Sequence, residues 1–473
     1  MSILSTPKQT HNEHSVKTDT EVNTLDHAPA AIAPAAIAPA PVAIRPSKMI
    51  TNLAVNEPGP PDGNTTRRPP ALAHLCRRLV SKRLRALCSQ RLDIREVPAH
   101  ASPPAASGSP NEIRIHDVQF YQRLLFGGSL GAAESYLRGE WSSNDLLATM
   151  RLLVRKVQEL ESLDRESGHL QRPLRWALRW LHRNNLAGSR RNIAAHYDLS
   201  NQFFSLMLDP TMTYSAGLFA APSCSMEEAS LAKYKRICDH LQLTSQDRLL
   251  EIGSGWGGFA VYAAHHYGCQ VTTATISQAQ YEFAQARIAE AGLQDQIDLR
   301  LCDYRKLSGQ YDKLVSIEMI EAVGERYLPH YFRTCSQLLA RHGMMMLQAI
   351  VIPDMRYRSY CRSVDFIQRY IFPGGFLPSF SAIGQALRDE TDLRLVQCDD
   401  FGLHYAETLS RWRAKFWQNI ERVRALGFDD RFIRMWHYYL CYCEAGFRER
   451  QVGVSQILLE KPGSRRTSQL DDR

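Results

Sequence analysis

The stretch that decides the fold is LLEIGSGWGGFA, residues 249–260, which joins a short apolar run to closely spaced glycines. An apolar run, a glycine-rich turn and a helical pattern, in this order, predict a strand, a tight turn and a helix N-terminus. Gly253, Gly255 and Gly257 carry no Cβ, so a nucleotide-like ligand could approach the backbone closely. A strand-to-helix bend without any ligand is the alternative interpretation.

The chemistry of this turn favours one ligand. Its glycine spacing is not GxGxxG, and it lacks the Lys-Ser/Thr pair of a phosphate-binding loop. Glu251, at the expected end of the strand, could accept hydrogen bonds from a cationic ligand. We therefore predict S-adenosylmethionine as the cofactor. No cysteine pair recurs at zinc-ligand spacing, and we predict no metal site.

Strand patterns alternate with helical patterns on both sides of the turn. The expected strands lie near residues 248–252, 270–275, 297–301, 313–317 and 344–351. This alternation predicts an α/β fold with a doubly wound, mainly parallel sheet. Ligands of such sheets bind beyond the carboxyl ends of the strands, which is where the glycine turn falls.

Composition divides the 473-residue chain into four parts. Residues 1–70 are polar and then Ala/Pro-rich, which predicts a disordered tail. Residues 71–185 predict a smaller N-terminal helical or mixed domain, with a strand at 113–120 and a helix from about Asp145. The α/β domain is expected over residues 186–462, and residues 463–473 are expected to form a flexible tail.

The net charge of +8 indicates an acidic partner, either an anionic membrane surface or nucleic acid. Residues 72–88 have the pattern of a basic amphipathic helix, which either packs on its own domain or also touches anionic headgroups. A second basic helical stretch lies at 170–191. The chain has no RNA-binding signature, base-flipping motif or basic stripe with stacking aromatics, so we expect no nucleic-acid partner.

The start of the chain lacks the apolar run of a signal peptide, and prolines interrupt residues 28–44 too often for a membrane span. The eleven cysteines follow no disulfide framework. We therefore expect a cytoplasmic protein with free thiols, in peripheral contact with a phospholipid bilayer at the inner face of the cell membrane.

Polar residues follow several of the expected strands. Thr275 and Gln280 stand where a ribose-binding fold usually has an acidic side chain, and they could supply the ribose contacts. Asp303 and Tyr304 suit the amino group and ring face of adenine, although a surface turn explains them as well. Upstream, the polar and aromatic segments 196–201 and 208–215 are typical of a lid or cofactor clamp, or of a connecting loop.

Two carboxylates, Glu318 and Glu321, lie three residues apart in an apolar run. Buried carboxylates are costly unless they are paired, so at least one of them is expected to face the active-site crevice. The alternative is that both pair with nearby Arg or Lys side chains at a helix start.

The order of the motifs identifies a family resemblance. From about residue 110 to 462 the chain resembles the cyclopropane fatty acid synthase family, through the segments HYDLSNQFF, LDPTMTYS, EIGSGWGGFA, TISQAQ, DYR, SIEMIEAVG, YIFPGGFLPS and FGLHYAETL. The resemblance implies a class I methyltransferase fold. It also implies transfer of a methylene group from S-adenosylmethionine to a cis double bond of a phospholipid acyl chain, which forms a cyclopropane ring.

The resemblance also assigns roles to residues. It places Tyr214 and Ser215 over the cofactor, Gly253 and Gly255 against its methionine part, Thr275 and Gln280 at its ribose, and Asp303 and Tyr304 at its adenine. It further implies a bound bicarbonate that deprotonates a carbocation, with Glu321, Tyr405 and the backbone at Ile350 as its ligands. Aromatic rings that could stabilise the cation are those of Tyr304, Tyr370, Phe372 and Phe376.

Two positions depart from the family pattern. Ala216 stands where a bicarbonate-binding Cys is common, and Gln348 stands where many members have His. Because Ala216 weakens the base site, the alternative product is a methyl-branched or methylene chain. A homodimer is possible, but the sequence does not determine the oligomeric state.

Overall fold

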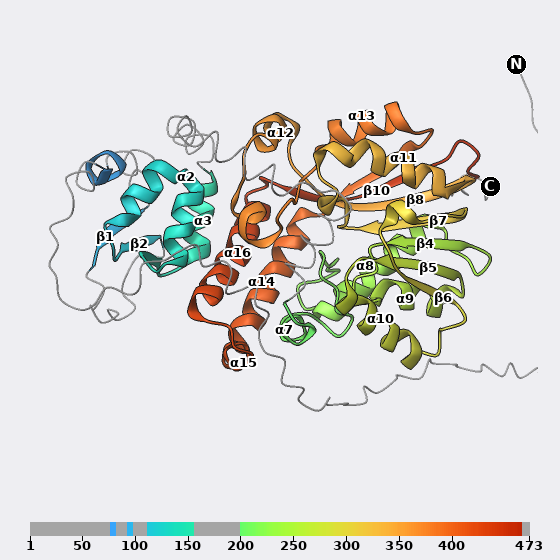
Figure 1. Cartoon of the computed structure of the whole chain (residues 1–473), viewed down its shortest axis with the longest axis horizontal. Coiled ribbons are helices and arrows are strands. Elements are labelled where there is room, and N and C mark those ends of the chain that lie inside the picture. The colour runs from blue at the N-terminus through green and yellow to red at the C-terminus, as the bar shows by residue number, and fades with distance from the viewer. Residues whose placement is uncertain (1–75, 82–91, 98–110, 156–198, 466–473) are drawn as a thin grey trace, which may run out of the picture. The chain divides into compact units, whose positions relative to one another are not determined.

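The computed structural model describes residues 76–81, 92–97, 111–155 and 199–465 (Figure 1). Of the expected basic helix at 72–88, residues 76–81 are helical. The rest of that helix, the expected tail at 1–70, the stretch 170–191 and most of the tail 463–473 lie outside the described residues.

Besides the helical residues 76–81, the described N-terminal part contains a three-stranded sheet in the order β1-β2-β3 and the helices α2 and α3. Their bounds are β1 Asp93–Glu96, β2 Glu112–Ile115, α2 Gln119–Leu137, β3 Trp141–Ser143 and α3 Leu146–Arg155. The prediction of a strand over 113–120 is wrong beyond Ile115. Asp117 accepts a hydrogen bond from the Gln119 backbone at 2.8 Å, which starts α2, so Phe120 is helical. The helix expected from Asp145 is α3.

The main domain is built on a seven-stranded sheet in the order β6-β5-β4-β7-β8-β10-β9. Strands β4 to β8 are parallel to one another, and β10 is antiparallel to both β8 and β9. The strand bounds are β4 Arg248–Ile252, β5 Gln270–Thr275, β6 Ile297–Leu301, β7 Tyr311–Ile317, β8 Leu339–Val351, β9 Arg394–Asp400 and β10 Gly453–Glu460. The predicted α/β class and all five predicted strands are confirmed, whereas β9 and β10 were not predicted.

Helices cover both faces of this sheet (Figure 1). Leu249 faces a core shared with α8, α9 and α10, while its neighbour Leu250 faces a core shared with α11 and α13. Successive residues of a strand point to opposite faces, so the continuous apolar run of β4 serves both layers. The covering helices are α8 Met226–Leu241, α9 Gly258–Tyr267, α10 Gln278–Glu290, α11 Leu328–Leu338 and α13 Phe380–Glu390.

The remaining elements lie around the carboxyl ends of the parallel strands or connect them. They are α7 Asn201–Ser205, η2 Tyr304–Lys306, η3 Ile320–Ala322, η4 Glu325–Tyr327, α12 Asp354–Cys361, η5 Ile367–Ile371, α14 Gly402–Gln418, α15 Ile420–Ala425 and α16 Asp430–Arg448. No helix within the described ranges combines the length and the apolar character needed to cross a membrane. The cysteines in those ranges are all free thiols.

Candidate functional site

The glycine turn between β4 and α9 has the left-handed backbone that only glycine adopts without strain. The φ angles of Gly253, Gly255 and Gly257 are 97°, 49° and 81°. The Gly253 N–H donates to the Ala274 carbonyl at 3.0 Å, which ties the turn to β5. A Cβ added at Gly255 would meet nothing within 4 Å, so the turn borders open space.

That space is a cavity of about 2290 Å³ at the carboxyl ends of the parallel strands. It brings together eleven of the twelve predicted site residues: Tyr214, Ser215, Gly253, Gly255, Thr275, Gln280, Asp303, Tyr304, Glu321, Ile350 and Tyr405. The twelfth, Gln348, is fully buried behind the cavity wall on β8. The tertiary structure therefore assembles a single site from segments spread over nearly 200 residues of sequence.

The residues predicted for ribose and adenine line one part of this cavity. The Thr275 hydroxyl donates to Gln280 Oε1 at 2.9 Å, which orients the amide. The Asp303 carboxylate is held by the Arg305 guanidinium at 2.8 and 2.7 Å and accepts from the Arg305 backbone. Within the described residues the buried Tyr304 hydroxyl has no hydrogen-bond partner. An unpartnered polar group beside an open glycine turn fits a polar cofactor such as S-adenosylmethionine.

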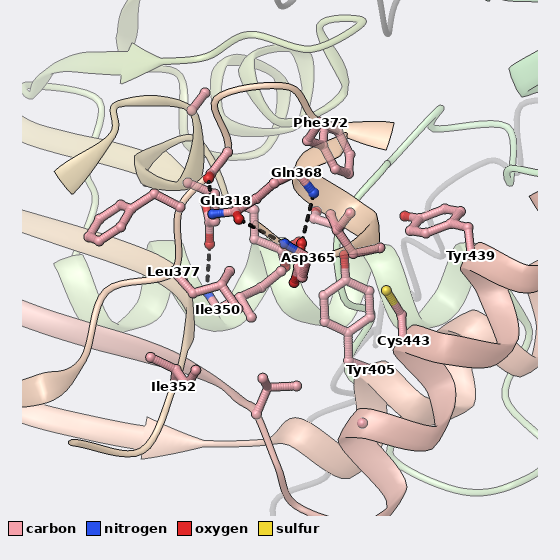
Figure 2. A pocket seen from close by; sticks show the side chains of 18 of the residues that line it. Glu318, Ile350, Ile352, Asp365, Gln368, Phe372, Leu377, Tyr405, Tyr439 and Cys443 are labelled. Carbon is pink, nitrogen blue, oxygen red and sulfur yellow. Dashed lines mark hydrogen bonds between the residues drawn. The ribbon is translucent and has the colours of Figure 1, made fainter. Parts of the chain in front are cut away.

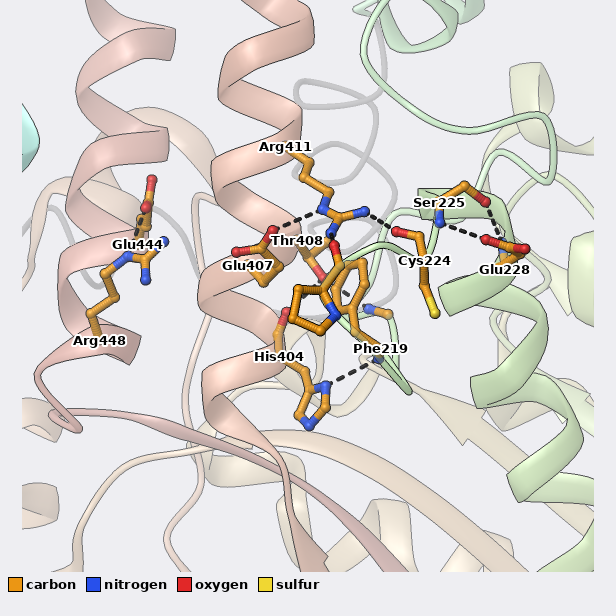
Figure 3. A network of polar contacts seen from close by, with 12 residues as sticks. Phe219, Cys224, Ser225, Glu228, His404, Glu407, Thr408, Arg411, Glu444 and Arg448 are labelled. Atoms are coloured by element: carbon orange, nitrogen blue, oxygen red, sulfur yellow. Dashed lines mark hydrogen bonds and ion pairs between the residues drawn. The ribbon is translucent and has the colours of Figure 1, made fainter.

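The expected clamp segment is anchored on helix α14. The Tyr214 ring stacks on Trp412 with centroids 5.0 Å apart, and its hydroxyl lies 2.9 Å from that of Tyr439. The Gly217 N–H donates to Thr408 Oγ1 at 3.0 Å. Figure 3 shows the continuation of this anchor, in which the Phe219 N–H donates to His404 Nδ1 at 3.1 Å. The backbone around residues 214–219 is therefore held in place by the helix that also carries Tyr405.

A cluster of donors surrounds the carboxylate of Glu318, which follows β7. The Ala216 N–H donates to Glu318 Oε1 at 2.9 Å, and Gln348 Nε2 donates to the same oxygen at 2.7 Å. The Tyr405 hydroxyl lies near this carboxylate and interacts with it electrostatically. Figure 2 shows Glu318 and Tyr405 at the wall of the cavity. These donors come from a loop, a strand and a helix, and they converge on one anion.

A buried ammonium stands near this anion. Lys233, on α8, is fully buried, and its Nζ donates to the Ser215 hydroxyl at 2.6 Å. Burial lowers the pKa of Lys233 to about 8, against the opposing charges of Glu318 and Asp209. Burial raises the pKa of Glu318, and the Lys233 charge is the first of the interactions that oppose this rise. The buried ammonium and the half-buried carboxylate therefore stabilise one another.

Glu321 is the second carboxylate of the site and behaves differently. Its Oε1 accepts the Ile350 N–H at 2.6 Å, while its buried Oε2 has no partner among the residues that the structure describes. Burial, reinforced by the charge of Glu318, raises the pKa of Glu321 to about 8. Glu321 therefore holds a proton at neutral pH, whereas the hydrogen bonds from Ala216 and Gln348 and the nearby Lys233 ammonium favour the ionised form of Glu318. Two adjacent half-buried carboxylates do not both ionise easily.

The expected bicarbonate does not fit this arrangement. Of its predicted ligands, the Ile350 N–H is bound to Glu321, and the Tyr405 hydroxyl lies next to Glu318. The amide of Gln348 and the backbone of Ala216 also donate to Glu318. The donors that would hold a small anion are thus already engaged by side-chain carboxylates of the chain itself.

The predicted aromatic residues separate into two groups. Tyr304, Phe372 and Phe376 line the cavity. Tyr370 does not line it, and the prediction for Tyr370 is wrong: its hydroxyl donates to Glu134 at 2.9 Å. Tyr370 belongs to the π-helical segment η5, whose geometry places neighbouring side chains in directions that the sequence pattern does not indicate.

Sequence reasoning did not assign a role to two residues at the centre of the site. Glu318 was visible as one of a pair of carboxylates in an apolar run, but its donors come from positions 216, 348 and 405. Lys233 lies within an ordinary helical pattern, and its sequence carries no signal of burial.

Comparison with known proteins places this site in context. The family model "Mycolic acid cyclopropane synthetase" matches residues 184–457. The chain is 42% identical over 352 residues to tuberculostearic acid methyltransferase UfaA1 of Mycobacterium tuberculosis, covering 72% of this chain and 81% of that protein. It is 36% identical over 365 residues to cyclopropane-fatty-acyl-phospholipid synthase of Escherichia coli, covering 76% and 90%. The structure of mycolic acid cyclopropane synthase CmaA1 with SAH and CTAB aligns with a TM-score of 0.55 and 29% identity, covering 57% of this chain and 98% of that one.

Proposed function

Because the chain belongs to the mycolic acid cyclopropane synthetase family and is an S-adenosylmethionine-dependent methyltransferase of lipid acyl chains, we propose that it cyclopropanates phospholipids. In this proposal the substrate is a cis double bond in an unsaturated acyl chain, and the product carries one added methylene group. The observation that carries the proposal is a single cavity that joins the glycine turn to a buried carboxylate cluster.

The cofactor would lie on the glycine turn. Gly253 and Gly255 would border its methionine part, Thr275 and Gln280 its ribose, and Asp303 and Tyr304 its adenine, while Tyr214 and Ser215 would close over it. S-adenosylmethionine, when bound, supplies an electrophilic methyl group. The chain's own part is to exclude water and to align the alkene with that group, because an alkene is a weak nucleophile.

Apolar and aromatic side chains would position the acyl chain. Ile352, Phe372 and Tyr439 line the cavity (Figure 2). Phe376 and Leu409 line it as well. A wall of this kind favours a hydrocarbon chain over water, and ring faces near the reacting carbons stabilise developing positive charge.

We extend the proposal to a phospholipid bilayer surface as the partner, at the inner face of the cell membrane. At the cavity wall Arg358 and Arg362 are exposed on and just after α12, and the Met355 side chain is 81% exposed. Exposed arginines beside an exposed apolar side chain suit a surface of anionic headgroups. A homodimer remains a further proposal, to be tested by light scattering.

A second product class is favoured by one comparison. The relative that is 42% identical is named as a tuberculostearic acid methyltransferase rather than a cyclopropane synthase. A methylene chain would arise if a 1,2-hydride shift moved the positive charge onto the methyl-bearing carbon before the methyl group lost its proton. Loss of a proton from a neighbouring chain carbon would instead give a methyl-branched alkene. Both product classes need the same cofactor and the same cavity.

Product analysis tests the proposal. The purified protein would be incubated with methyl-labelled S-adenosylmethionine and vesicles of mono-unsaturated phospholipid, and the acyl chains analysed by mass spectrometry before and after catalytic hydrogenation under conditions that leave cyclopropane rings intact. We expect a labelled chain with one added CH₂ that takes up no hydrogen. A labelled chain of the same mass that takes up two hydrogens would identify the alternative class, a methylene or methyl-branched alkene product, and no labelled lipid would contradict both.

Cofactor affinity is expected to depend on Glu251. Burial raises its pKa to about 7, opposed by the hydrogen bond from the Thr273 hydroxyl at 2.5 Å. S-adenosylmethionine is cationic and would therefore bind more tightly to the ionised Glu251 carboxylate than to its protonated form. Its affinity should rise with pH and level off above about 7. Below that pKa the change is up to about tenfold per pH unit. Calorimetry at several pH values measures it. Glu251→Gln should bind weakly without this pH dependence, and Glu282→Gln, an exposed site on α10, should behave as wild type.

A further inference from the structure

We propose that the carboxylate of Glu318 is the base of the reaction and takes the place of bicarbonate. This inference rests on the proposed function and names the residue that completes it. The reacting alkene forms a new C–C bond to the methyl carbon as the C–S bond breaks, which leaves a carbocation on the acyl chain. Glu318 then removes a proton from the new methyl group, and the C–H electron pair closes the ring onto the cationic carbon.

The position of Glu318 is set by donors that an anion would need. One of its oxygens accepts from the Ala216 N–H at 2.9 Å and from Gln348 Nε2 at 2.7 Å, and the Tyr405 hydroxyl lies near the carboxylate. Ala216, Gln348 and Tyr405 are the positions where the family resemblance led us to look for an anion site. The anion found there belongs to the chain itself.

The amide of Gln348 is oriented so that it can only donate to Glu318. Its Oε1 accepts from Gln456 Nε2 at 3.0 Å, on the neighbouring strand β10, where Gln456 is the register partner of Gln348. With its oxygen engaged by Gln456, the Gln348 NH₂ group faces Glu318. Gln456 therefore holds the Gln348 NH₂ group in its orientation toward Glu318.

The backbone at Glu318 is unusual in a way that supports a function. Its φ is 50°, a left-handed conformation that is unfavourable for a residue with a Cβ. The Glu318 N–H donates to the Gln348 carbonyl at 2.8 Å, so β8 holds this conformation. Strain of this kind is typical of functional positions, since a glycine would meet the backbone requirement without any cost.

The charge state of the cluster suits a base. Lys233 compensates the negative charge of Glu318, while Glu321 holds a proton at neutral pH because its pKa is raised to about 8 by burial and by Glu318. Glu318 lines the cavity wall, so the anion has access to the reacting carbons. One ionised and one protonated carboxylate side by side is an arrangement that separates acid and base roles.

The test compares the wild type with Glu318→Gln and Glu318→Gly, in buffer freed of carbonate and in buffer with millimolar bicarbonate. We expect wild-type turnover to be the same in both buffers. Glu318→Gln should lose at least about 100-fold in turnover while still binding S-adenosylmethionine. Glu318→Gly should be inactive without bicarbonate and regain activity with it, because glycine accepts the φ of 50° and frees the donors for an external anion. Glu325→Gln, at an exposed position in η4, is the matched control and should remain active.

A second measurement does not depend on turnover. Carbon-13 NMR with labelled bicarbonate should detect binding to Glu318→Gly but not to the wild type. Bicarbonate binding by the wild type, bicarbonate-dependent wild-type turnover, or full activity of Glu318→Gln would each overturn the inference. If the wild type labels no lipid, the proposed function fails, while the NMR comparison still decides whether Glu318 occupies the anion site.

Discussion

Gly255→Leu is expected to lower the affinity for S-adenosylmethionine by at least about 100-fold. A Cβ at this position meets nothing within 4 Å, so the leucine side chain would extend into the cavity on which the methionine part of the cofactor would lie. Forcing extra atoms into a filled site costs about 1–3 kcal/mol, and displacement of the cofactor from the turn would weaken its packing as well. A factor of 100 corresponds to about 2.7 kcal/mol. Isothermal titration calorimetry with S-adenosylmethionine measures it.

Gly292→Leu is the matched control for the backbone effect. Gly292 also has a left-handed φ, 67°, and a Cβ there also meets nothing within 4 Å, but it lies in an exposed turn after α10. Both variants should lose about 1–2 kcal/mol of stability from the left-handed conformation. Only Gly255→Leu should lose cofactor binding. Equal affinities in the two variants would refute the placement of the cofactor on the glycine turn.

Lys233→Met is expected to destabilise the domain by about 3–5 kcal/mol, because it removes a fully buried ammonium and leaves the half-buried Glu318 carboxylate without its compensating charge. For a domain of this size the melting temperature should fall by roughly 10 °C. The pKa of Glu318, already raised by burial, should rise further, so turnover at neutral pH should fall and partly recover at higher pH. Differential scanning calorimetry and a pH–rate profile measure these two effects.

Two companion variants separate charge compensation from packing. Lys235→Met, on the same helix, removes an exposed lysine that pairs with Asp239, and it should leave the melting temperature unchanged. The double variant Lys233→Met/Glu318→Gln removes both buried charges and should be more stable than Lys233→Met alone. If the double variant is no more stable, Lys233 acts by packing and does not compensate Glu318.

Local patterns in the sequence were sufficient for most of the α/β domain. The run that ends at Ile252 and the glycines that follow it predicted β4, the turn and α9, because the left-handed φ angles of this turn require glycine. Strands β9 and β10 were missed, since β9 is largely exposed and β10 pairs antiparallel with β8, far away in sequence. Because β10 was not predicted, the role of its residue Gln456, which orients Gln348, was not predicted either.

For the candidate site, the sequence identified most of the residues but not the contacts between them. Motif order led to eleven residues that line one cavity, but it treated Tyr405, Ile350 and Glu321 as ligands of an external anion. The structure has Ile350 bonded to Glu321, and Tyr405 next to Glu318. Which donor meets which carboxylate depends on rotamers and on distances between elements, and a linear motif does not encode either.

What the sequence determined by itself was the α/β fold, the glycine turn and the family, because strand periodicity, φ requirements and motif order are local properties. Only the tertiary structure decided which anion these hydrogen-bond donors surround, the carboxylate of Glu318. Ala216, Gln348 and Tyr405 lie on three elements, and only the packed sheet and α14 bring their donors to one carboxylate. Burial then determines the charges, since the energy of an ionised group depends on its surroundings and not on its neighbours in the chain.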